Sequence, residues 1–464
     1  MSAVKKIAVI GTGYVGLVSG TCFAEIGNKV VCCDIDVSKI RSLKNGVIPI
    51  YEPGLADLVE KNVLGQRLTF TNDIPSAIRA SDIIYIAVGT PMSKTGEADL
   101  TYVKAAAKTI GEHLNGYKVI VNKSTVPVGT GKLVQSIVQK ASRGRYSFDV
   151  VSNPEFLREG SAIHDTMNME RAVIGSTSHK AAAIIEDLHQ PFHAPVIKTN
   201  LESAEMIKYA ANAFLATKIS FINDIANICE RVGADVSKVA DGVGLDSRIG
   251  RKFLKAGIGF GGSCFPKDTT ALLQIAKSAG YPFKLIEAVI ETNEKQRVHI
   301  VDKLLTVMGS IKGRTISVLG LAFKPNTNDV RSAPALDIIP MLQQLGAHVK
   351  AYDPIAIPEA SVILGEQVEY YTDVYAAIEH TDACLILTDW PEVKEMELVK
   401  VKTLLKQPII IDGRNLFSLE EMQAAGYIYH SIGRPAVRGT EPSDKYFPGL
   451  PLEELAKDFG SVNL

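Results

Sequence analysis

One cysteine of the chain stands in a stretch where packing does not explain it. Cys264 lies within GFGGSCFPKD, residues 259–268, whose glycines make a buried helix or strand implausible and predict a loop that backbone amides can line. A free thiol has a pKa of ~8.5 and is only a few per cent thiolate at neutral pH. Lys267, or a lysine from elsewhere in the chain, is expected to lower that pKa. The stretch alone leaves two interpretations, a reactive thiol and an inert thiol in a turn.

A glycine fingerprint near the N-terminus predicts a cofactor. In KKIAVIGTGYVG an apolar strand leads into Gly11, Gly13 and Gly16, a helical segment follows, and the next strand ends at Asp34. The glycines let the backbone approach a pyrophosphate at the helix N-terminus, and the aspartate binds the adenosine ribose hydroxyls. Asp34 would repel a 2′-phosphate, so the pattern favours NAD over NADP. The alternative is a tight turn that binds no ligand.

An NAD domain and a reactive cysteine together suggest one kind of chemistry. Oxidation of an alcohol to an acid takes two hydride transfers, and a thiolate can hold the intermediate aldehyde as a thiohemiacetal. The thiohemiacetal then becomes a thioester that water hydrolyses. A donor for the developing oxyanion is also required. Lys208 and Asn212 are candidates because they lie four residues apart on one face of a predicted helix, the alternative being a solvated helix face.

Continuous apolar runs predict the sheet that positions these groups. Runs such as SDIIYIAVGTP and FDVVSNPEFL do not alternate with polar residues, as expected for parallel strands that are buried on both faces. We therefore predict an α/β, doubly wound, Rossmann-like domain over residues 1–200. Apolar residues at three-to-four spacing from 201 to 232 predict one long helix, which either bridges domains or pairs with a second subunit.

The opening pattern recurs in the second half of the chain. A strand, Gly320, a helix and a strand that ends at Asp353 follow one another, but the polar loop LAFKPNTNDV replaces the glycine fingerprint. We expect a second Rossmann-like domain over residues 312–440 that binds no dinucleotide. A central helical domain with the long helix and the cysteine loop is expected over 201–311. The remaining residues, 441–464, are expected to form a weakly packed C-terminal extension.

Composition and charge exclude several classes of protein. The 464 residues are too many for one hydrophobic core. The 50 Lys and Arg residues balance 51 Asp and Glu, so no overall field attracts nucleic acid or an anionic membrane. The six cysteines have no repeated spacing, which favours reduced thiols and no metal site. The N-terminus leaves no room for a signal-peptide core, and we expect a soluble cytoplasmic protein.

Nine motifs in order resemble the UDP-glucose/GDP-mannose dehydrogenase family over nearly the whole chain. They are GTGYVGL, PIYEPGL, VGTP, STVPVGT, NPEFLREG, EMIKYAANAFLA, GFGGSCFPKD, GLAFKPNTNDVR and DGRN. The resemblance implies an NAD-dependent, four-electron oxidation of UDP-glucose to UDP-glucuronate through a thiohemiacetal and a thioester on a cysteine. GDP-mannose is the alternative substrate, and a UDP-N-acetyl-hexosamine fits less well. A non-catalytic sensor of NAD or nucleotide sugars is a further alternative, although a sensor has no need of a nucleophile.

The resemblance also implies roles for individual residues. Cys264 is implied as the nucleophile, Lys208, Asn212 and Asp268 as the group that stabilises the oxyanion and activates water, and Thr125 and Glu155 as aids to hydrolysis. Cofactor contacts are implied at Gly11, Gly13, Tyr14, Val15, Gly16, Asp34, Lys39, Thr90, Thr125, Glu159, Lys267 and Arg331. Contacts to the UDP-sugar are implied at Glu155, Phe156, Leu157, Arg158, Glu159, Lys208, Asn212, Arg248, Phe253, Leu254, Lys255, Ala256, Gly257, Gly261, Lys324 and Arg414. Arg248 resembles a residue that crosses a subunit interface, which implies a homodimer or a larger homo-oligomer.

Overall fold

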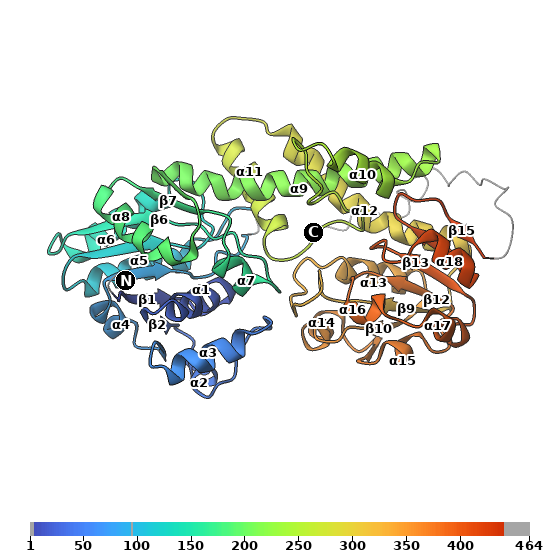
Figure 1. Ribbon diagram of the computed structural model, residues 1–464, viewed down its shortest axis with the longest axis horizontal. Helices are drawn as coiled ribbons and strands as arrows, with labels where there is room; N and C mark the ends of the chain where they lie inside the picture. The colour runs from blue at the N-terminus through green and yellow to red at the C-terminus, as the bar shows by residue number, and fades with distance from the viewer. Residues whose placement is uncertain (1–3, 94–95, 440–464) are drawn as a thin grey trace. The chain divides into compact units, whose positions relative to one another are not determined.

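The fold is that of a computed structural model, which describes residues 4–93 and 96–439. The chain forms two compact units, each made of three segments (Figure 1). Of the described residues, those up to 218 and those in 260–291 and 324–332 form the first unit, and those in 219–259, 292–323 and from 333 onward form the second. The C-terminal extension expected over 441–464 lies outside the described residues.

An eight-stranded sheet forms the core of the first unit. Its strand order is β3-β2-β1-β4-β5-β6-β7-β8, and neighbouring strands are parallel except for the antiparallel pair β6 and β7. The strands are β1 (Lys6–Ile10), β2 (Lys29–Cys33), β3 (Leu68–Thr71), β4 (Ile83–Ile86), β5 (Lys118–Asn122), β6 (Phe148–Ser152), β7 (Ala172–Ser176) and β8 (Val196–Thr199).

Helices cover both faces of this sheet, as Figure 1 shows. They are α1 (Tyr14–Glu25), α2 (Val37–Lys44), α3 (Leu55–Leu64), α4 (Ile74–Ala80), α5 (Thr101–His113), α6 (Thr130–Ser142), α7 (Ala162–Met167), α8 (His179–His189) and the short 3₁₀ helix η1 (Gln190–Phe192). Alternate residues of β1 belong to different cores: Ile7 and Val9 pack with α1, α3 and α8, whereas Ala8 and Ile10 pack with α4, α5 and α6. Both faces of the strand are therefore buried, which explains its continuous apolar sequence.

The second unit is built on a seven-stranded sheet with the order β11-β10-β9-β12-β13-β14-β15, in which only the last pair is antiparallel. Its strands are β9 (Thr315–Leu319), β10 (His348–Tyr352), β11 (Val368–Tyr371), β12 (Ala383–Ile386), β13 (Ile409–Asp412), β14 (Ile428–Ser431) and β15 (Val437–Arg438). Its helices are α13 (Ala335–Gln344), α14 (Ile357–Leu364), α15 (Val374–Ile378), α16 (Pro391–Lys394), α17 (Leu398–Leu404) and α18 (Leu419–Ala425). The prediction of two Rossmann-like sheets is confirmed.

Four further helices follow the first sheet: α9 (Leu201–Val232), α10 (Val236–Gly244), α11 (Phe265–Ser278) and α12 (Lys284–Met308). Helix α9 is the long helix predicted from the apolar spacing, and its residues belong partly to each unit. Within the first unit, Tyr209 and Ala213 of α9 pack against Ala271 and Leu272 of α11. This packing fixes the face of α9 that carries Lys208 and Asn212 relative to the start of α11.

The loop predicted over residues 259–268 is shorter than expected. Helix α11 already begins at Phe265, so Lys267 and Asp268 lie in its first turn and Cys264 is its N-cap residue. Pro266 suits this position, because the amide that proline lacks would have no partner in the first turn of a helix. The glycine-rich part of the stretch, up to Gly262, is the loop that the sequence indicates.

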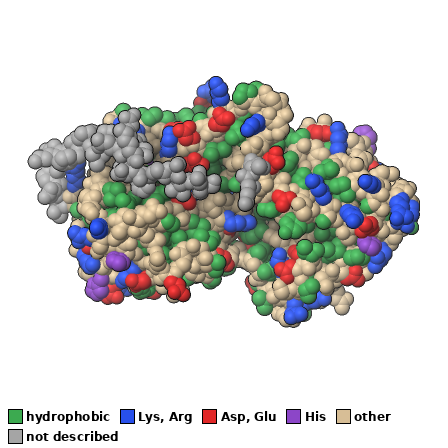
Figure 2. Space-filling view, turned by 180° about the vertical axis from the view of Figure 1, so that it is seen from behind, with side chains coloured by type: hydrophobic (Ala, Val, Ile, Leu, Met, Phe, Trp, Pro, Cys, Tyr) green, Lys and Arg blue, Asp and Glu red, His purple; other side chains and the backbone are tan. Residues whose placement is uncertain are grey.

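The described surface carries both charge signs. On the face that Figure 2 shows, Lys and Arg side chains occur among Asp and Glu side chains, in keeping with the net charge of −1. Within residues 4–93 and 96–439, every helix is too short or too polar to span a bilayer.

Candidate active site

The loop after β1 has the glycine geometry of a phosphate-binding turn. Gly11 has a φ of +102°, and a Cβ there would lie 2.6 Å from the carbonyl oxygen of Ala87. A Cβ on Gly16 would overlap the carbonyl oxygen of Gly11, so glycine is needed for α1 to approach the loop. A Cβ on Gly13 would meet no described atom within 4 Å. Helix α1 starts here, at Tyr14 and Val15, without a side-chain cap among the described residues, and its amides fit a pyrophosphate.

Asp34 directly follows β2 beside this loop. Its Oδ2 accepts hydrogen bonds from the amide and the hydroxyl of Thr12, both at 2.8 Å, and Lys39 Nζ lies 3.7 Å away. Burial raises the pKa of Asp34, but hydrogen bonds from Thr12 and Asp36 and the charge of Lys39 outweigh burial and lower the pKa overall. The carboxylate is therefore ionised at neutral pH, as an acceptor for ribose hydroxyls must be.

Helix α9 brings a buried lysine and an amide close to acidic side chains. Lys208 Nζ lies 2.9 Å from Glu155 Oε1, and the two side chains are only 4% and 6% exposed. One turn further along α9, Asn212 Nδ2 donates to Asp268 Oδ2 at 2.6 Å. Lys267 Nζ contacts the other oxygen of Asp268, also at 2.6 Å. The solvated helix face that the sequence left open is therefore wrong for Lys208 and Asn212.

Cys264 is half-buried, whereas the other five cysteines are fully buried. Burial raises the pKa of the Cys264 thiol, the charge of Lys208 lowers it, and the charges of Glu155 and Asp268 raise it, which leaves the pKa above its ordinary value. The expected net lowering of this pKa is therefore wrong in this structure. The physical reason is that Lys267 is paired with Asp268, while burial outweighs the effect of Lys208.

Thr90 and Thr125 lie on the loops that follow β4 and β5. Thr90 Oγ1 donates to the carbonyl oxygen of Thr125 at 2.9 Å, which ties the two loops together. Thr125 and Lys208 line the same small pocket, with Glu205 also on its wall. These loops are at the carboxyl edge of the sheet, where α/β proteins bind their ligands.

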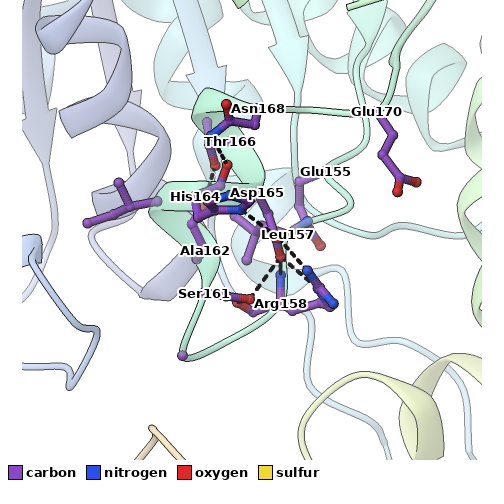
Figure 3. Close-up of polar contacts among 12 residues, drawn as sticks. Glu155, Leu157, Arg158, Ser161, Ala162, His164, Asp165, Thr166, Asn168 and Glu170 are labelled. Carbon is purple, nitrogen blue, oxygen red and sulfur yellow. Dashed lines mark hydrogen bonds and ion pairs between the residues drawn. The ribbon is translucent and has the colours of Figure 1, made fainter. Parts of the chain in front are cut away.

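The segment from Glu155 to Gly160 is held by contacts within its own loop and α7. Arg158 donates through its amide and Nε to Asp165 Oδ2 at 2.9 Å and reaches Oδ1 at 2.6 Å, and Ser161 contacts the same carboxylate (Figure 3). The guanidinium of Arg158 is thus engaged by Asp165, which shapes the loop that the neighbouring predicted residues occupy.

Phe156 and Leu157, which precede Arg158, make different contacts. The Leu157 amide donates to Glu155 Oε2 at 2.8 Å, and the Leu157 side chain packs against the core of the first sheet. The Phe156 ring lies 4.0 Å from the Arg171 guanidinium and 5.5 Å from Lys208 Nζ, both measured to the ring centroid. The loop therefore contributes an aromatic face and a buried carboxylate next to Lys208.

The segment 324–332 of the first unit lies against the cysteine loop. The Gly262 amide donates to the carbonyl oxygen of Arg331 at 2.8 Å, and Arg331 Nη2 lies 3.3 Å from Glu159 Oε1. Burial lowers the pKa of Lys324, although the charge of Glu159 partly offsets it. Gly261 is buried in the same loop. The first unit thus brings together Cys264, Lys208, Asn212, Asp268, Glu155, Glu159, Gly261, Lys267, Lys324 and Arg331.

The second unit holds the remaining predicted substrate residues. The Gly257 amide donates to Asn223 Oδ1 at 2.9 Å, and a Cβ on Gly257 would lie 3.7 Å from Arg414 Nη1. Arg414 Nε donates to the Leu387 carbonyl oxygen at 2.6 Å. Leu254 and Ala256 are buried, and Phe253 has a φ of +65°. The segment 253–257 and Arg414 therefore lie together within this unit.

Two predicted residues of the second unit form ion pairs at the surface. Lys255 Nζ lies 3.1 Å from Asp389 Oδ2. Arg248 pairs with Asp246 at 2.6 Å, and its side chain is 87% exposed. Arg248 therefore projects from the surface of its own chain.

The sequence did not assign a role to Glu52, although it lies within the motif PIYEPGL. This buried carboxylate accepts hydrogen bonds from the Gly160 amide and the Ala162 amide, both at 2.7 Å, and from the hydroxyl of Tyr14. Burial raises the pKa of Glu52, and the hydrogen bonds from these amides limit the rise. Glu52 thereby joins the glycine fingerprint to the 155–160 loop, a long-range link that only the motif itself could have suggested.

Comparisons with known proteins agree with this geometry. Models of the UDP-glucose/GDP-mannose dehydrogenase family match residues 5–193 as the NAD binding domain, 202–295 as the central domain and 317–419 as the UDP binding domain. The chain is 98% identical to UDP-glucose 6-dehydrogenase TuaD of Bacillus subtilis (strain 168), over 99% of this chain and all of the relative. It is 51% identical to UDP-glucose 6-dehydrogenase YwqF of the same organism, over 93% of this chain and 98% of the relative.

Solved structures show the same fold. A UDP-glucose dehydrogenase of Pyrobaculum islandicum superimposes with a TM-score of 0.88 at 38% identity, covering 94% of this chain and 99% of that one. A GDP-mannose dehydrogenase of Pseudomonas aeruginosa superimposes with a TM-score of 0.52 at 30% identity, covering 89% and 97%. The predicted family and cofactor are confirmed: the chain belongs to the UDP-glucose/GDP-mannose dehydrogenase family, and residues 5–193 are its NAD-binding domain.

Proposed function

We propose that the protein oxidises UDP-glucose to UDP-glucuronate with two NAD, through a covalent intermediate on Cys264. The observation that carries this function is the buried cluster beside the half-buried thiol. It combines a cation, Lys208, an amide donor, Asn212, and a carboxylate, Asp268. These are the groups that an alcohol-to-acid oxidation needs around a nucleophile.

In the first oxidation, the hydroxyl at C6 of the sugar loses its proton to water as a hydride leaves the carbon, so negative charge develops on the oxygen. Bound NAD supplies the hydride acceptor. Burial lowers the pKa of Lys208, but the charges of Glu155, Cys264 and Asp268 raise it above its ordinary value, so the ammonium persists at neutral pH. The ammonium and the Asn212 amide stabilise the oxyanion as it forms. Asp268 orients Asn212 through their hydrogen bond.

In the second oxidation, Cys264 holds the aldehyde. Its thiolate forms a C–S bond to the aldehyde carbon, and the resulting thiohemiacetal loses a second hydride to leave a thioester. Water then cleaves the C–S bond, which releases the acid and restores the sulfur. We assign Thr125 and Glu155 to the placement of this water and to proton transfer, because Thr125 lines a pocket with Lys208 and Glu155 pairs with Lys208.

The binding residues follow from the two units. Within the first unit we assign NAD to the loop of Gly11, Gly13 and Gly16 and to Asp34, with Lys39, Thr90, Thr125, Glu159, Lys267 and Arg331 as further cofactor contacts. Within the second unit we assign UDP to the segment 253–257 and Arg414, whose buried guanidinium supplies positive charge for a pyrophosphate. The remaining predicted substrate residues are assigned to the sugar.

We also propose that the protein is a homodimer or a larger homo-oligomer. Three apolar side chains of α9 at heptad spacing, Phe214, Phe221 and Ile228, are 66%, 53% and 52% exposed. Such a stripe favours pairing with the same helix of a second copy. The exposed Arg248 is then available to the site of a second subunit. As domain boundaries we propose 1–200, 201–311 and 312–440, followed by the extension.

The test is the stoichiometry of NADH. Purified protein with excess NAD and a limiting amount of UDP-glucose is expected to release two NADH per sugar. GDP-mannose and UDP-N-acetylglucosamine are tested in parallel and are expected to react far more slowly. If GDP-mannose gave two NADH per sugar and reacted faster than UDP-glucose, the protein would instead be a GDP-mannose dehydrogenase. No turnover with any of the three sugar nucleotides would contradict the proposal.

A further inference from the structure

The hydroxyl of Ser263 joins the thiol of Cys264 to a buried carboxylate. Ser263 Oγ donates to Glu159 Oε1 at 3.0 Å and lies 3.5 Å from Cys264 Sγ. A serine hydroxyl has a single proton to donate. When that proton is directed at Glu159, the thiol is the donor in its contact with Ser263. A continuous path of two hydrogen bonds therefore leads from the sulfur to Glu159.

A second carboxylate, Asp329, adjoins the end of this path. Arg331 Nη2 lies 3.3 Å from Glu159 Oε1 and 2.7 Å from Asp329 Oδ2, so the guanidinium joins the two acids. The Glu159 side chain is 8% exposed, and no donor among the described residues reaches its buried Oε2. A buried carboxylate oxygen without a donor is costly, and protonation of the group removes that cost.

The pKa values of Glu159 and Asp329 shift in opposite directions. Burial, together with the charge of Asp329 and a hydrogen bond with it, raises the pKa of Glu159, Arg331 and Ser263 limit the rise, and the net value is about 7. Burial also raises the pKa of Asp329, but hydrogen bonds and charge from Arg331 outweigh burial and lower it. Near neutral pH, Glu159 is therefore the member of the pair that takes up and releases a proton.

Other charged groups also face the thiol, and the acids among them, Glu155 and Asp268, already accept hydrogen bonds from cations or amides. Glu155 accepts a hydrogen bond from Lys208, and Asp268 accepts hydrogen bonds from Asn212 and Lys267. Lys208 is itself a protonated cation and cannot accept a proton. Lys324 and Arg331 interact with both Cys264 and Glu159 through their positive charge. Among the described hydrogen bonds of Glu155, Glu159 and Asp268, those of Glu159 form a path to the sulfur.

We propose that Ser263 relays the proton of the Cys264 thiol to Glu159, and that Asp329 acts as a positioning residue for that proton. The Sγ–H bond breaks as the proton moves to Ser263 Oγ, and the proton of Ser263 moves to Glu159 Oε1. The electron pair of the Sγ–H bond stays on the sulfur. A thiol and a carboxylate thereby become a thiolate and a carboxylic acid, and nothing is oxidised or reduced.

The relay explains how a thiol with a raised pKa becomes a nucleophile. Burial opposes a thiolate in this position, so loss of its proton needs both an acceptor and a donor that remains to stabilise the sulfur. After the transfer, protonated Glu159 donates to Ser263 and Ser263 donates to the thiolate. The relay rests on the proposed function, because that function supplies the aldehyde that the thiolate attacks. Ionisation of the thiol can still be measured without any sugar nucleotide.

The experiment follows alkylation of Cys264 by iodoacetamide from slightly acidic to alkaline pH in the full-length protein. The other five cysteines are buried, and Cys264→Ala supplies the background rate. Ser263→Ala removes the donor to the thiolate and is expected to raise the thiol pKa by about one unit, which slows alkylation at neutral pH about tenfold. Ser263→Thr keeps a hydroxyl and is expected to restore the rate. Ser161→Ala, whose hydroxyl contacts Asp165, is the matched control and is expected to change nothing.

Glu159→Gln separates the relay from a general disturbance of the site. Its amide cannot take up the proton of the thiol, so alkylation at neutral pH is expected to be slower than in the unchanged protein. The same pH profile for Ser263→Ala and the unchanged protein would overturn the proposal, and so would unchanged or faster alkylation in Glu159→Gln. Absence of UDP-glucose turnover would contradict the proposed function while leaving this measurement intact.

Discussion

In each of the two sheets an aspartate follows the second strand, but the two aspartates have different surroundings. Asp34 follows β2, and Oδ2 accepts hydrogen bonds from Thr12 while the side chain stays 12% exposed. Asp353 follows β10 and is fully buried. Its two oxygens accept hydrogen bonds from five donors of the second unit, the amides of Leu321, Ala322, Ile355 and Ala356 and the indole of Trp390.

The glycine turn before each aspartate is retained. Gly11 and Gly320 have φ values of +102° and +105°, and a Cβ on either would collide with a neighbouring loop, at Ala87 and Thr388. What differs is the remaining capacity for a ligand. Asp34 keeps an accessible side, whereas Trp390 and four amides saturate Asp353. The fold alone therefore does not determine which sheet binds a dinucleotide, and the groups around the aspartate do.

The largest expected effect follows removal of the saturated aspartate. Asp353→Ala leaves five buried donors without an acceptor, which should lower the free energy of unfolding by about 3–5 kcal/mol. Urea unfolding followed by circular dichroism measures it. A loss below about 1 kcal/mol would show that the hydrogen bonds around Asp353 do not hold its loop together.

Asp34→Ala tests whether the aspartate of the first sheet binds the cofactor. Loss of an ionised acceptor for the ribose should weaken NAD binding about 10–100-fold, the usual range for hydrogen bonds to a charged group. Calorimetric titration with NAD and with UDP-glucose measures both affinities. An equal loss for the sugar nucleotide would mean that Asp34 supports the fold, as Asp353 does, rather than the cofactor.

Gly13→Ala alters the cofactor loop and leaves both aspartates in place. A Cβ at this position meets no described atom within 4 Å, so the thermal unfolding temperature should stay unchanged. A methyl group in the path of a pyrophosphate should still weaken NAD binding about tenfold, since glycine there permits close backbone approach. NAD affinity equal to that of the unchanged protein would place the phosphates elsewhere.

The smallest effect is expected for Lys39→Ala. Lys39 Nζ lies 3.7 Å from Asp34, and its side chain is 32% exposed, so solvent screens the ion pair. Such pairs contribute about 0–1 kcal/mol, and NAD affinity should fall less than about fivefold. A loss as large as that of Asp34→Ala would make Lys39 a direct ligand of the cofactor.

Local sequence patterns predicted much of this fold, because each helix or strand requires its own spacing of apolar residues. The apolar spacing from Leu201 to Val232 sets one helix, and the order of strand, glycines and Asp34 sets the cofactor loop. Contacts between segments that are far apart in the sequence have no such local pattern. The links from Glu52 to Gly160 and from Ser263 to Glu159 span 108 and 104 positions. The raised pKa of Cys264 depends on burial, which no short motif determines.

In the proposed mechanism, Cys264 holds an aldehyde between two oxidations. Cys264→Ala, incubated with UDP-glucose and NAD, tests it most directly when NADH and UDP-glucuronate are followed together by absorbance and chromatography. We predict that the unchanged protein forms two NADH for each acid, whereas Cys264→Ala forms no acid and keeps its affinity for NAD. Production of UDP-glucuronate by Cys264→Ala at the rate of the unchanged protein would contradict the covalent mechanism.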